Sequence, residues 1–87
     1  MKITVRLFAT FRDFLPQHAI RSALRLDVQE DESVGAVLKA LHVPAELPKI
    51  VLINGRHAAE DSLLADGDVV SVFPPLIGGL SRGNIEY

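Results

Sequence analysis

Apolar and polar residues alternate in two stretches near the start of this 87-residue chain. Residues 2–9 place aliphatic side chains on one face and Thr4, Arg6 and Phe8 on the other, and residues 23–29 repeat the alternation. A period of two is typical of a strand with one buried face. The pattern therefore predicts a strand over each range, with a loop and a helical turn between them.

The period changes after Ser33. Aliphatic residues then fall at i, i+3, i+4 and i+7, which is one face of a helix: Val34, Val37, Leu38 and Leu41. Ser33 is a natural N-cap, since its side-chain oxygen can accept a hydrogen bond from a free amide of the first turn. The prolines at 44 and 48 close the helical region.

Residues 49–53 are predicted to form a strand, apolar without interruption from Ile50 to Ile53, that ends in an Asn-Gly pair. Both residues of this pair tolerate positive φ, so the pair is a strong hairpin signal. We expect a short return strand over residues 56–61 and a last strand over residues 69–73, which Pro74 stops. Five strands with a single main helix predict an α+β domain: a mixed sheet with the helix packed on one face.

One face of this sheet is left without a helix. Half of the apolar run at 50–53 must point toward that face, and the alternation puts Phe8 and Phe73 there as well. We expect an exposed apolar patch rimmed by Arg6 and Arg12, and patches of this kind mark protein interfaces. The alternative is that the segment from Phe11 to Ile20 folds over part of this face.

Composition narrows the function classes. Hydrophobic residues make up 48% of the chain and aromatic residues only 6%, so the core must be aliphatic. A formal net charge of −2 with scattered Lys and Arg gives no basic stripe for nucleic acid, and no apolar run is long enough to span a membrane. The absence of cysteine excludes disulfides and thiolate chemistry, and favours a reducing cytoplasm.

Side chains with catalytic or metal-binding potential are scattered. The three histidines, His18, His42 and His57, stand far apart and lack the spacing of zinc ligands, so we expect no metal site. The acidic pairs at 60–61 and in the 66–68 turn fit ordinary turn chemistry. We expect no stably bound cofactor.

The segment PPLIGG, residues 74–79, differs from an ordinary loop in composition. The two prolines remove backbone donors and extend the chain, while Gly78 and Gly79 remove side chains where the backbone would enter a narrow channel. Such a segment is suited to insertion into another protein. Pro-Pro and Gly-Gly also occur in ordinary loops, so the motif by itself leaves both interpretations open.

The segment VLINGRHAAEDSLLADGDVVSVFPPLIGG resembles the C-terminal half of the MoaD/ThiS family of sulfur-carrier proteins. The similarity consists of an apolar strand, an Asn-Gly turn, a DGD turn and strand, and then Phe-Pro-Pro before Gly-Gly. The first strand, ending in Phe8-Ala9 and followed by Arg12, resembles MoaD, the small subunit of molybdopterin synthase. This resemblance implies a ubiquitin-like β-grasp fold with the first and last strands side by side at the centre of the sheet.

The resemblance also implies a mechanism. In that family a ubiquitin-activating-like enzyme uses ATP to adenylate the carboxylate of the terminal glycine, which then becomes a thiocarboxylate that donates sulfur. Gly79 would carry the sulfur here, preceded by Gly78, and catalytic side chains would belong to partner enzymes. The acceptor would be the large subunit of molybdopterin synthase or a similar enzyme. The expected partner-binding residues are those of the apolar patch and the tail: Phe8, Arg12, Phe73, Pro74, Pro75, Leu76 and Ile77.

One feature departs from the family pattern. Gly79 is followed by LSRGNIEY, and a glycine in a peptide bond has no free carboxylate. We therefore expect a carrier domain over 1–79 and an extension over 80–87 that a protease removes. Two alternatives stay open: a non-catalytic β-grasp subunit that docks on a larger enzyme, and a ubiquitin-like modifier of other proteins.

Overall fold

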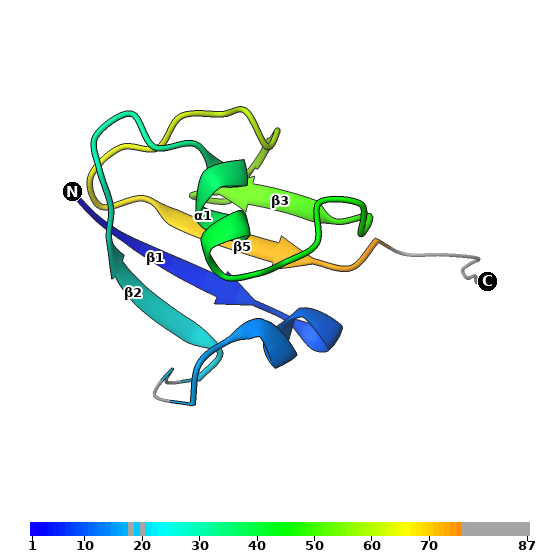
Figure 1. Cartoon of the computed structure of the whole chain (residues 1–87). Helices are drawn as coiled ribbons and strands as arrows, with labels where there is room; N and C mark the ends of the chain where they lie inside the picture. The colour runs from blue at the N-terminus through cyan, green and yellow to red at the C-terminus, as the bar shows by residue number, and fades with distance from the viewer. Residues whose placement is uncertain (18, 20, 76–87) are drawn as a thin grey trace.

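The computed structural model describes residues 1–17, 19 and 21–75 of the chain (Figure 1). The predicted strands are present as β1 (Lys2–Leu7), β2 (Ala23–Asp27), β3 (Ile50–Ile53), β4 (Arg56–Ala58) and β5 (Val69–Phe73). The return strand is shorter than the predicted range 56–61. It ends early because Ala59 and Ser62 close a turn: the Ala59 amide donates to Ser62 Oγ at 3.1 Å, and the Ser62 amide donates to the Ala59 carbonyl at 3.1 Å.

The strands form one mixed sheet in the order β2-β1-β5-β3-β4. The central pair, β1 with β5, is parallel and the other pairs are antiparallel. One main helix, α1, lies across one face of this sheet (Figure 1). The fold is the ubiquitin-like β-grasp that the sequence predicted, with the first and last strands side by side at its centre.

Helix α1 (Val34–Ala40) begins where the sequence predicted. Ser33 has an extended backbone, and its Oγ accepts a hydrogen bond from the Ala36 amide at 3.1 Å. The helix also lies close to the loop after β4, because the Gly35 amide donates to the Glu60 carbonyl at 2.7 Å. A Cβ at Gly35 would lie only 3.1 Å from that oxygen, so glycine permits this approach.

Loss of the N-cap should cost measurable stability. Ser33→Ala removes the acceptor of the Ala36 amide and is expected to lower the free energy of unfolding by about 1 kcal/mol, with no change in fold. Urea unfolding followed by circular dichroism measures this difference. Ser33→Asp keeps an acceptor and is the matched control. Equal loss of stability in both variants would show that capping is not the role of this serine.

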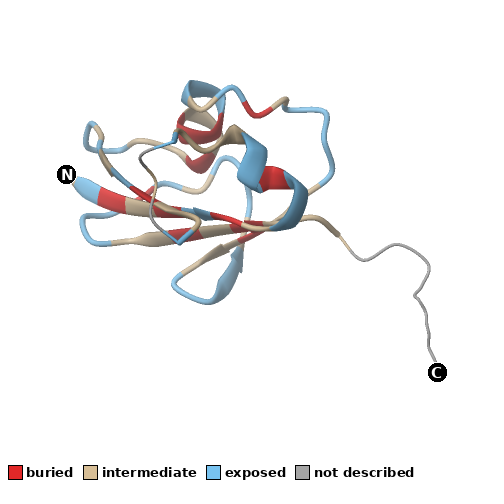
Figure 2. Cartoon of the chain, turned by 90° about the horizontal axis from the view of Figure 1, so that it is seen from below, coloured by how far each residue is buried: buried red, intermediate tan, exposed pale blue. Residues whose placement is uncertain are grey.

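The core lies between the sheet and α1, as the buried residues in Figure 2 show. Its members are aliphatic residues from β1, β3, β5 and α1 and two from loops, Val43 and Leu64, together with one aromatic residue, Phe11, which is 3% exposed. Phe11 belongs to the 3₁₀-helix η1 (Ala9–Phe14), which contacts β1 and β5. Because Phe11 packs on the helix side, the alternative in which this part of the segment 11–20 covers the opposite face is wrong.

Asn54 connects two turns at one end of the sheet: the Asn-Gly turn after β3 and the turn before β5. Asn54 and Gly55 have φ values of 52° and 84°, as the hairpin prediction requires. The Asn54 side chain donates to Asp68 Oδ1 and accepts from the Val69 amide, both at 2.9 Å. The other carboxylate oxygen of Asp68 accepts from the Ala65 amide at 2.8 Å. Asn54 therefore ties the β3–β4 hairpin to the start of β5.

Candidate functional site

The last strand, β5, brings the chain to the end of the sheet at which Phe73 lies. β5 runs parallel to β1, and the pairing continues past β1 because the Phe8 amide donates to the Val72 carbonyl at 3.1 Å. Pro74 and Pro75 follow at this end and are half-buried. Four of the predicted site residues lie outside the described residues: Leu76, Ile77, Gly78 and Gly79. The described part of the site is therefore the point where the tail leaves the sheet.

Two aromatic rings stack beside this point. The Phe8 and Phe73 rings are parallel to within 3°, with centroids 4.4 Å apart, and both residues are half-buried. The Arg6 guanidinium carbon lies 5.1 Å from the Phe8 centroid, which is within cation–π range. Since Leu7 and Val72 point into the core, Phe8 and Phe73 point the other way. The structure thus brings together two residues that are separated by most of the chain.

The stacked rings belong to the face of the sheet that α1 leaves uncovered, which we call the outer face. Its members are the strand residues that alternate with the buried ones, together with Phe8: Lys2, Thr4, Arg6, Ala23, Arg25, Asp27, Ile50, Leu52, His57, Val69, Ser71 and Phe73. Ile50 pairs with Phe73 and Leu52 pairs with Ser71 in the register. As predicted, half of the apolar run in β3 points away from the helix.

Arg12 differs from Arg6 in its surroundings. It is an exposed residue of η1, and its guanidinium makes no hydrogen bond or ion pair with another residue that the structure describes. Its predicted place at the rim of the patch stays a prediction. The contact of Arg6 with Phe8 is the one that the structure shows.

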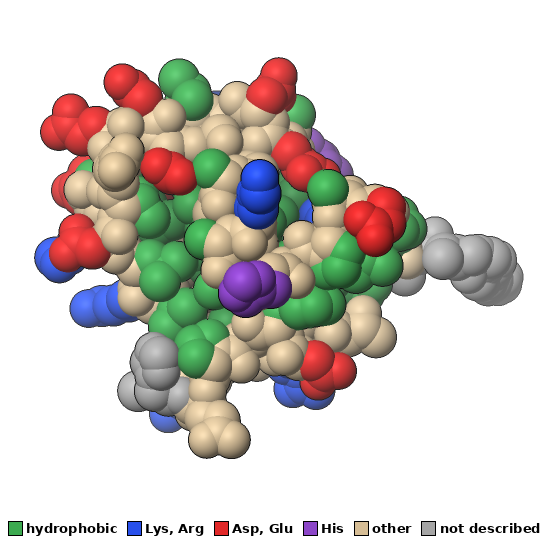
Figure 3. All heavy atoms as spheres, in the orientation of Figure 1, with side chains coloured by type: hydrophobic (Ala, Val, Ile, Leu, Met, Phe, Trp, Pro, Cys, Tyr) green, Lys and Arg blue, Asp and Glu red, His purple; other side chains and the backbone are tan. Residues whose placement is uncertain are grey.

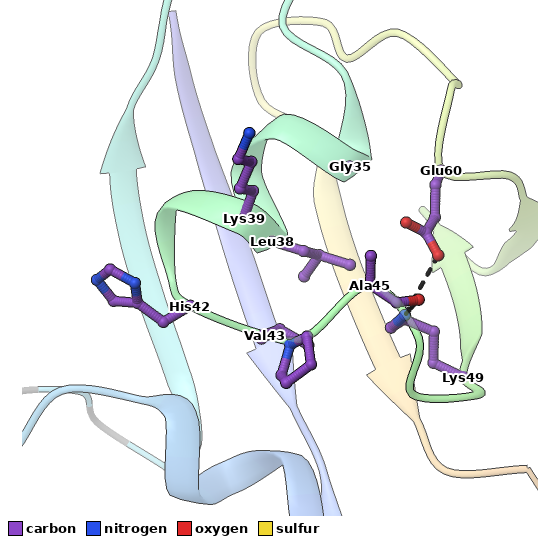
Figure 4. A pocket seen from close by; sticks show the side chains of 9 residues that line it. Gly35, Leu38, Lys39, His42, Val43, Ala45, Lys49 and Glu60 are labelled. Atoms are coloured by element: carbon purple, nitrogen blue, oxygen red, sulfur yellow. Dashed lines mark hydrogen bonds and ion pairs between the residues drawn. The ribbon is translucent and has the colours of Figure 1, made fainter.

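A groove of about 490 Å³ lies on the helix side, between α1, the loop that follows it and the segment after β4 (Figure 4). Apolar residues such as Leu38 and Val43 line it, and Lys49 reaches across to Glu60, with Nζ 3.2 Å from the carboxylate. The Lys49 side chain is only 4% exposed and also donates to the Ala45 carbonyl at 3.3 Å. This pair could not be predicted from the sequence, because its members belong to different segments. The groove is on the opposite side of the sheet from the aromatic stack.

The described residues contain neither a metal-binding cluster nor a membrane-spanning helix. Within residues 1–17, 19 and 21–75, no three His, Cys, Asp or Glu side chains are placed to hold a metal ion. In the same residues no helix has the length and apolar character needed to cross a membrane. His42 and His57 are exposed, and His18 lies outside the described residues.

Comparison with known proteins agrees with this geometry. Residues 1–76, which include every strand, α1 and the aromatic stack, match the family described as Mut7-C ubiquitin. The chain belongs to the Mut7-C ubiquitin family. It is also 35% identical to small archaeal modifier protein 3 of Haloferax volcanii, over 91% of this chain and 100% of the relative.

Two solved structures are similar to this member of the Mut7-C ubiquitin family. The crystal structure of SAMP1 from Haloferax volcanii has a TM-score of 0.68 and 29% identity, covering 91% of this chain and 100% of that one. A putative molybdopterin converting factor subunit 1 from Pyrococcus furiosus has a TM-score of 0.66 and 26% identity, covering 86% and 98%. These neighbours confirm the resemblance to MoaD-type proteins and the ubiquitin-like fold.

Proposed function

We propose that this protein is a sulfur carrier whose active group is the carboxylate of Gly79, exposed by removal of residues 80–87. A ubiquitin-activating-like enzyme would attach this carboxylate to the α-phosphate of ATP, releasing pyrophosphate. A sulfur donor at the oxidation level of sulfide would then attack the acyl carbon, forming the carbon–sulfur bond while the bond to AMP breaks, and AMP would leave a thiocarboxylate on Gly79. Molybdopterin synthesis is the pathway that we place first, with the large subunit of molybdopterin synthase, or a similar enzyme, as acceptor.

The observation that carries this proposal is the Gly-Gly pair that follows β5 and Pro-Pro in a chain without cysteine. Such a chain has no thiol on which to hold sulfur, so transferable sulfur must sit on an acyl group. The carboxylate of Gly79 would be that group. The structural neighbour from Pyrococcus furiosus, a putative molybdopterin converting factor subunit 1, supports the choice of pathway.

The aromatic stack suits the docking step. A partner that binds the outer face would hold Phe73 in place, and the tail begins at the next residue. With Phe73 as the anchor, Gly79 is six residues away, at most about 20 Å along an extended chain. The tail could therefore reach a catalytic site close to the docking surface.

A second candidate function is a ubiquitin-like modifier joined to other proteins through Gly79. It is favoured by the 35% identity to small archaeal modifier protein 3. Both functions need a free carboxylate on Gly79 and an activating enzyme, and they differ only in the step that follows adenylation. A non-catalytic subunit that docks through the outer face needs neither.

The mass of the protein isolated from its native cells should distinguish these functions. We expect a chain that ends at Gly79, and in a fraction of molecules an increase equal to the replacement of one oxygen by sulfur. Intact-protein mass spectrometry measures both. A chain that keeps residues 80–87 under all growth conditions would contradict the carrier and the modifier alike, and would favour the docking subunit.

A further inference from the structure

The strand β2 lies at one edge of the sheet, where half of its backbone groups point away from β1 (Figure 1). Val28 and Met1 exchange two hydrogen bonds of 2.8 Å across the start of this pair. Bonded and non-bonded residue pairs alternate along an antiparallel ladder, so Leu26 and Leu24 also bond to β1. The remaining residues of β2 direct their amides and carbonyls toward the open edge: Ala23, Arg25 and Asp27.

This edge is available for pairing with another strand. No residue that the structure describes forms a hydrogen bond with the outward backbone groups of β2. Proteins commonly protect such an edge with a proline or a β-bulge. β2 has no proline, and its register with β1 runs through five consecutive residue pairs without a bulge. An added strand could therefore extend the sheet at this edge.

The side chains along this edge carry opposite charges two residues apart. Arg25 is exposed and forms no ion pair with any described residue. Asp27 Oδ2 accepts a hydrogen bond from Lys2 Nζ at 2.9 Å, and this bond, followed by the charge attraction, lowers the pKa of Asp27. Asp27 Oδ1 lies 4.0 Å from the N-terminal ammonium, so it can still accept from another donor. Figure 3 shows positive and negative side chains next to one another at the left margin, where β2 lies in Figure 1.

This pattern of charges is complementary to itself. If β2 pairs in the antiparallel sense with β2 of a second copy, and Leu26 lies opposite its own counterpart, Arg25 faces Asp27 of the other copy twice. Because both residues direct their backbone groups outward, each of these pairs would also exchange two hydrogen bonds. A shift of two residues in either direction puts Arg25 opposite Arg25 or Asp27 opposite Asp27, and like charges directly opposite are destabilising. Backbone and charge therefore favour the same register.

We propose that two copies of this chain associate through their β2 strands in this register, so that the two five-stranded sheets become one. Leu26 points to the helix side and is half-buried in the monomer, so contact with its counterpart would cover more of its side chain. The symmetry puts both helices on one side of the joined sheet and both outer faces on the other. The association leaves Phe8, Phe73 and the end of β5 free in each copy, and it does not depend on the proposed function.

Sedimentation velocity of the 87-residue chain tests this association. One strand from each copy makes a small interface, so the dimer should be weak and is measured at concentrations up to about 1 mM. Arg25→Asp places carboxylates opposite each other, and Asp27→Arg places cations opposite each other. Each variant alone is expected to associate about 10-fold more weakly than the unmodified chain, or weaker still.

The two variants should bind each other, because their strands restore both pairs of opposite charges. The measurement is an NMR titration of ¹⁵N-labelled Asp27→Arg with unlabelled Arg25→Asp, which should bind about as tightly as two unmodified chains. Arg56→Asp is the matched control. It makes the same change of charge on β4, at the other edge of the sheet, and leaves β2 unmodified. We expect it to bind the labelled variant about 10-fold more weakly than Arg25→Asp does.

Three results would each overturn the inference: an unmodified chain that is monomeric at about 1 mM, single variants that associate as tightly as the unmodified chain, or equal binding of Arg25→Asp and Arg56→Asp. Circular dichroism shows whether the variants fold. If one does not, the unmodified chain still decides the question, because the amide signals of Arg25 and Asp27 should move on dilution while those of β4 stay in place. Signals of β2 that do not move would also rule out the pairing.

Discussion

Gly79→Val, in a chain that ends at residue 79, is expected to abolish adenylation and to leave the melting temperature unchanged. The reason is steric. An enzyme channel that accepts a bare backbone has no room for a β-branched side chain beside the reacting carboxylate, and misplacing the reacting group by about 1 Å can cost about 100-fold in rate. The measurement is ATP–pyrophosphate exchange catalysed by the activating enzyme, with thermal unfolding followed in parallel.

Gly83→Val in the 87-residue chain is the matched control, since it makes the same substitution within residues 80–87, the segment that we propose is removed. After processing it should be adenylated as well as the unmodified protein. The 87-residue chain, without the protease, should give no exchange. Full exchange by Gly79→Val, or by the unprocessed chain, would refute the assignment of Gly79 as the reacting residue.

Phe73→Ala is expected to weaken binding to the activating enzyme about 30-fold or more. An aromatic anchor near the centre of an interface commonly contributes about 2 kcal/mol or more, and about 1.4 kcal/mol corresponds to a factor of ten. Phe73 also holds Phe8 by stacking, so its loss removes two contact surfaces at once. Isothermal titration calorimetry with the activating enzyme and with the acceptor enzyme measures both affinities.

Leu63→Ala is the control for this experiment. Leu63 is 63% exposed and pairs with Ser33 near the start of α1, away from the outer face. Its truncation should leave both affinities unchanged. Phe8→Ala and the double variant complete a cycle in which the two phenylalanines should be strongly non-additive, because each loses its partner. Unchanged affinity of folded Phe73→Ala for both enzymes would remove Phe73 from the docking surface.

The strands and the helix could be predicted because local patterns decide them. The alternation in β1 and β5 and the Ser33 cap depend on neighbours within a few residues. The central pairing of β1 with β5 followed from the resemblance to the sulfur-carrier family. The contact of Phe8 with Phe73 followed from the alternation and from the pairing of β1 with β5. A parallel register places outward-pointing residues of the two strands on the same face.

Other features could not be predicted from the sequence, because they depend on contacts between distant segments. No local pattern indicates that the Lys49 side chain is buried against Glu60. No local pattern indicates that the Asn54 side chain forms hydrogen bonds with the turn before β5. Phe11 could not be assigned to either face, since η1 has neither a period of two nor a full helical period. Arg25 lies in a predicted strand, but its position near Arg6 depends on the β1–β2 register, which the alternation does not give.

The parallel pairing of β1 with β5 has a mechanical consequence. β1 begins next to the N-terminus and β5 ends where the tail begins, so the two ends of the described chain lie at opposite ends of the same central pair (Figure 1). A force applied between them would load the hydrogen bonds of this pair in shear, all together. Pulling apart the β3–β4 hairpin would instead break its bonds one after another. A domain pulled by the residues that follow β5 is therefore held at a central strand that resists extraction from the sheet.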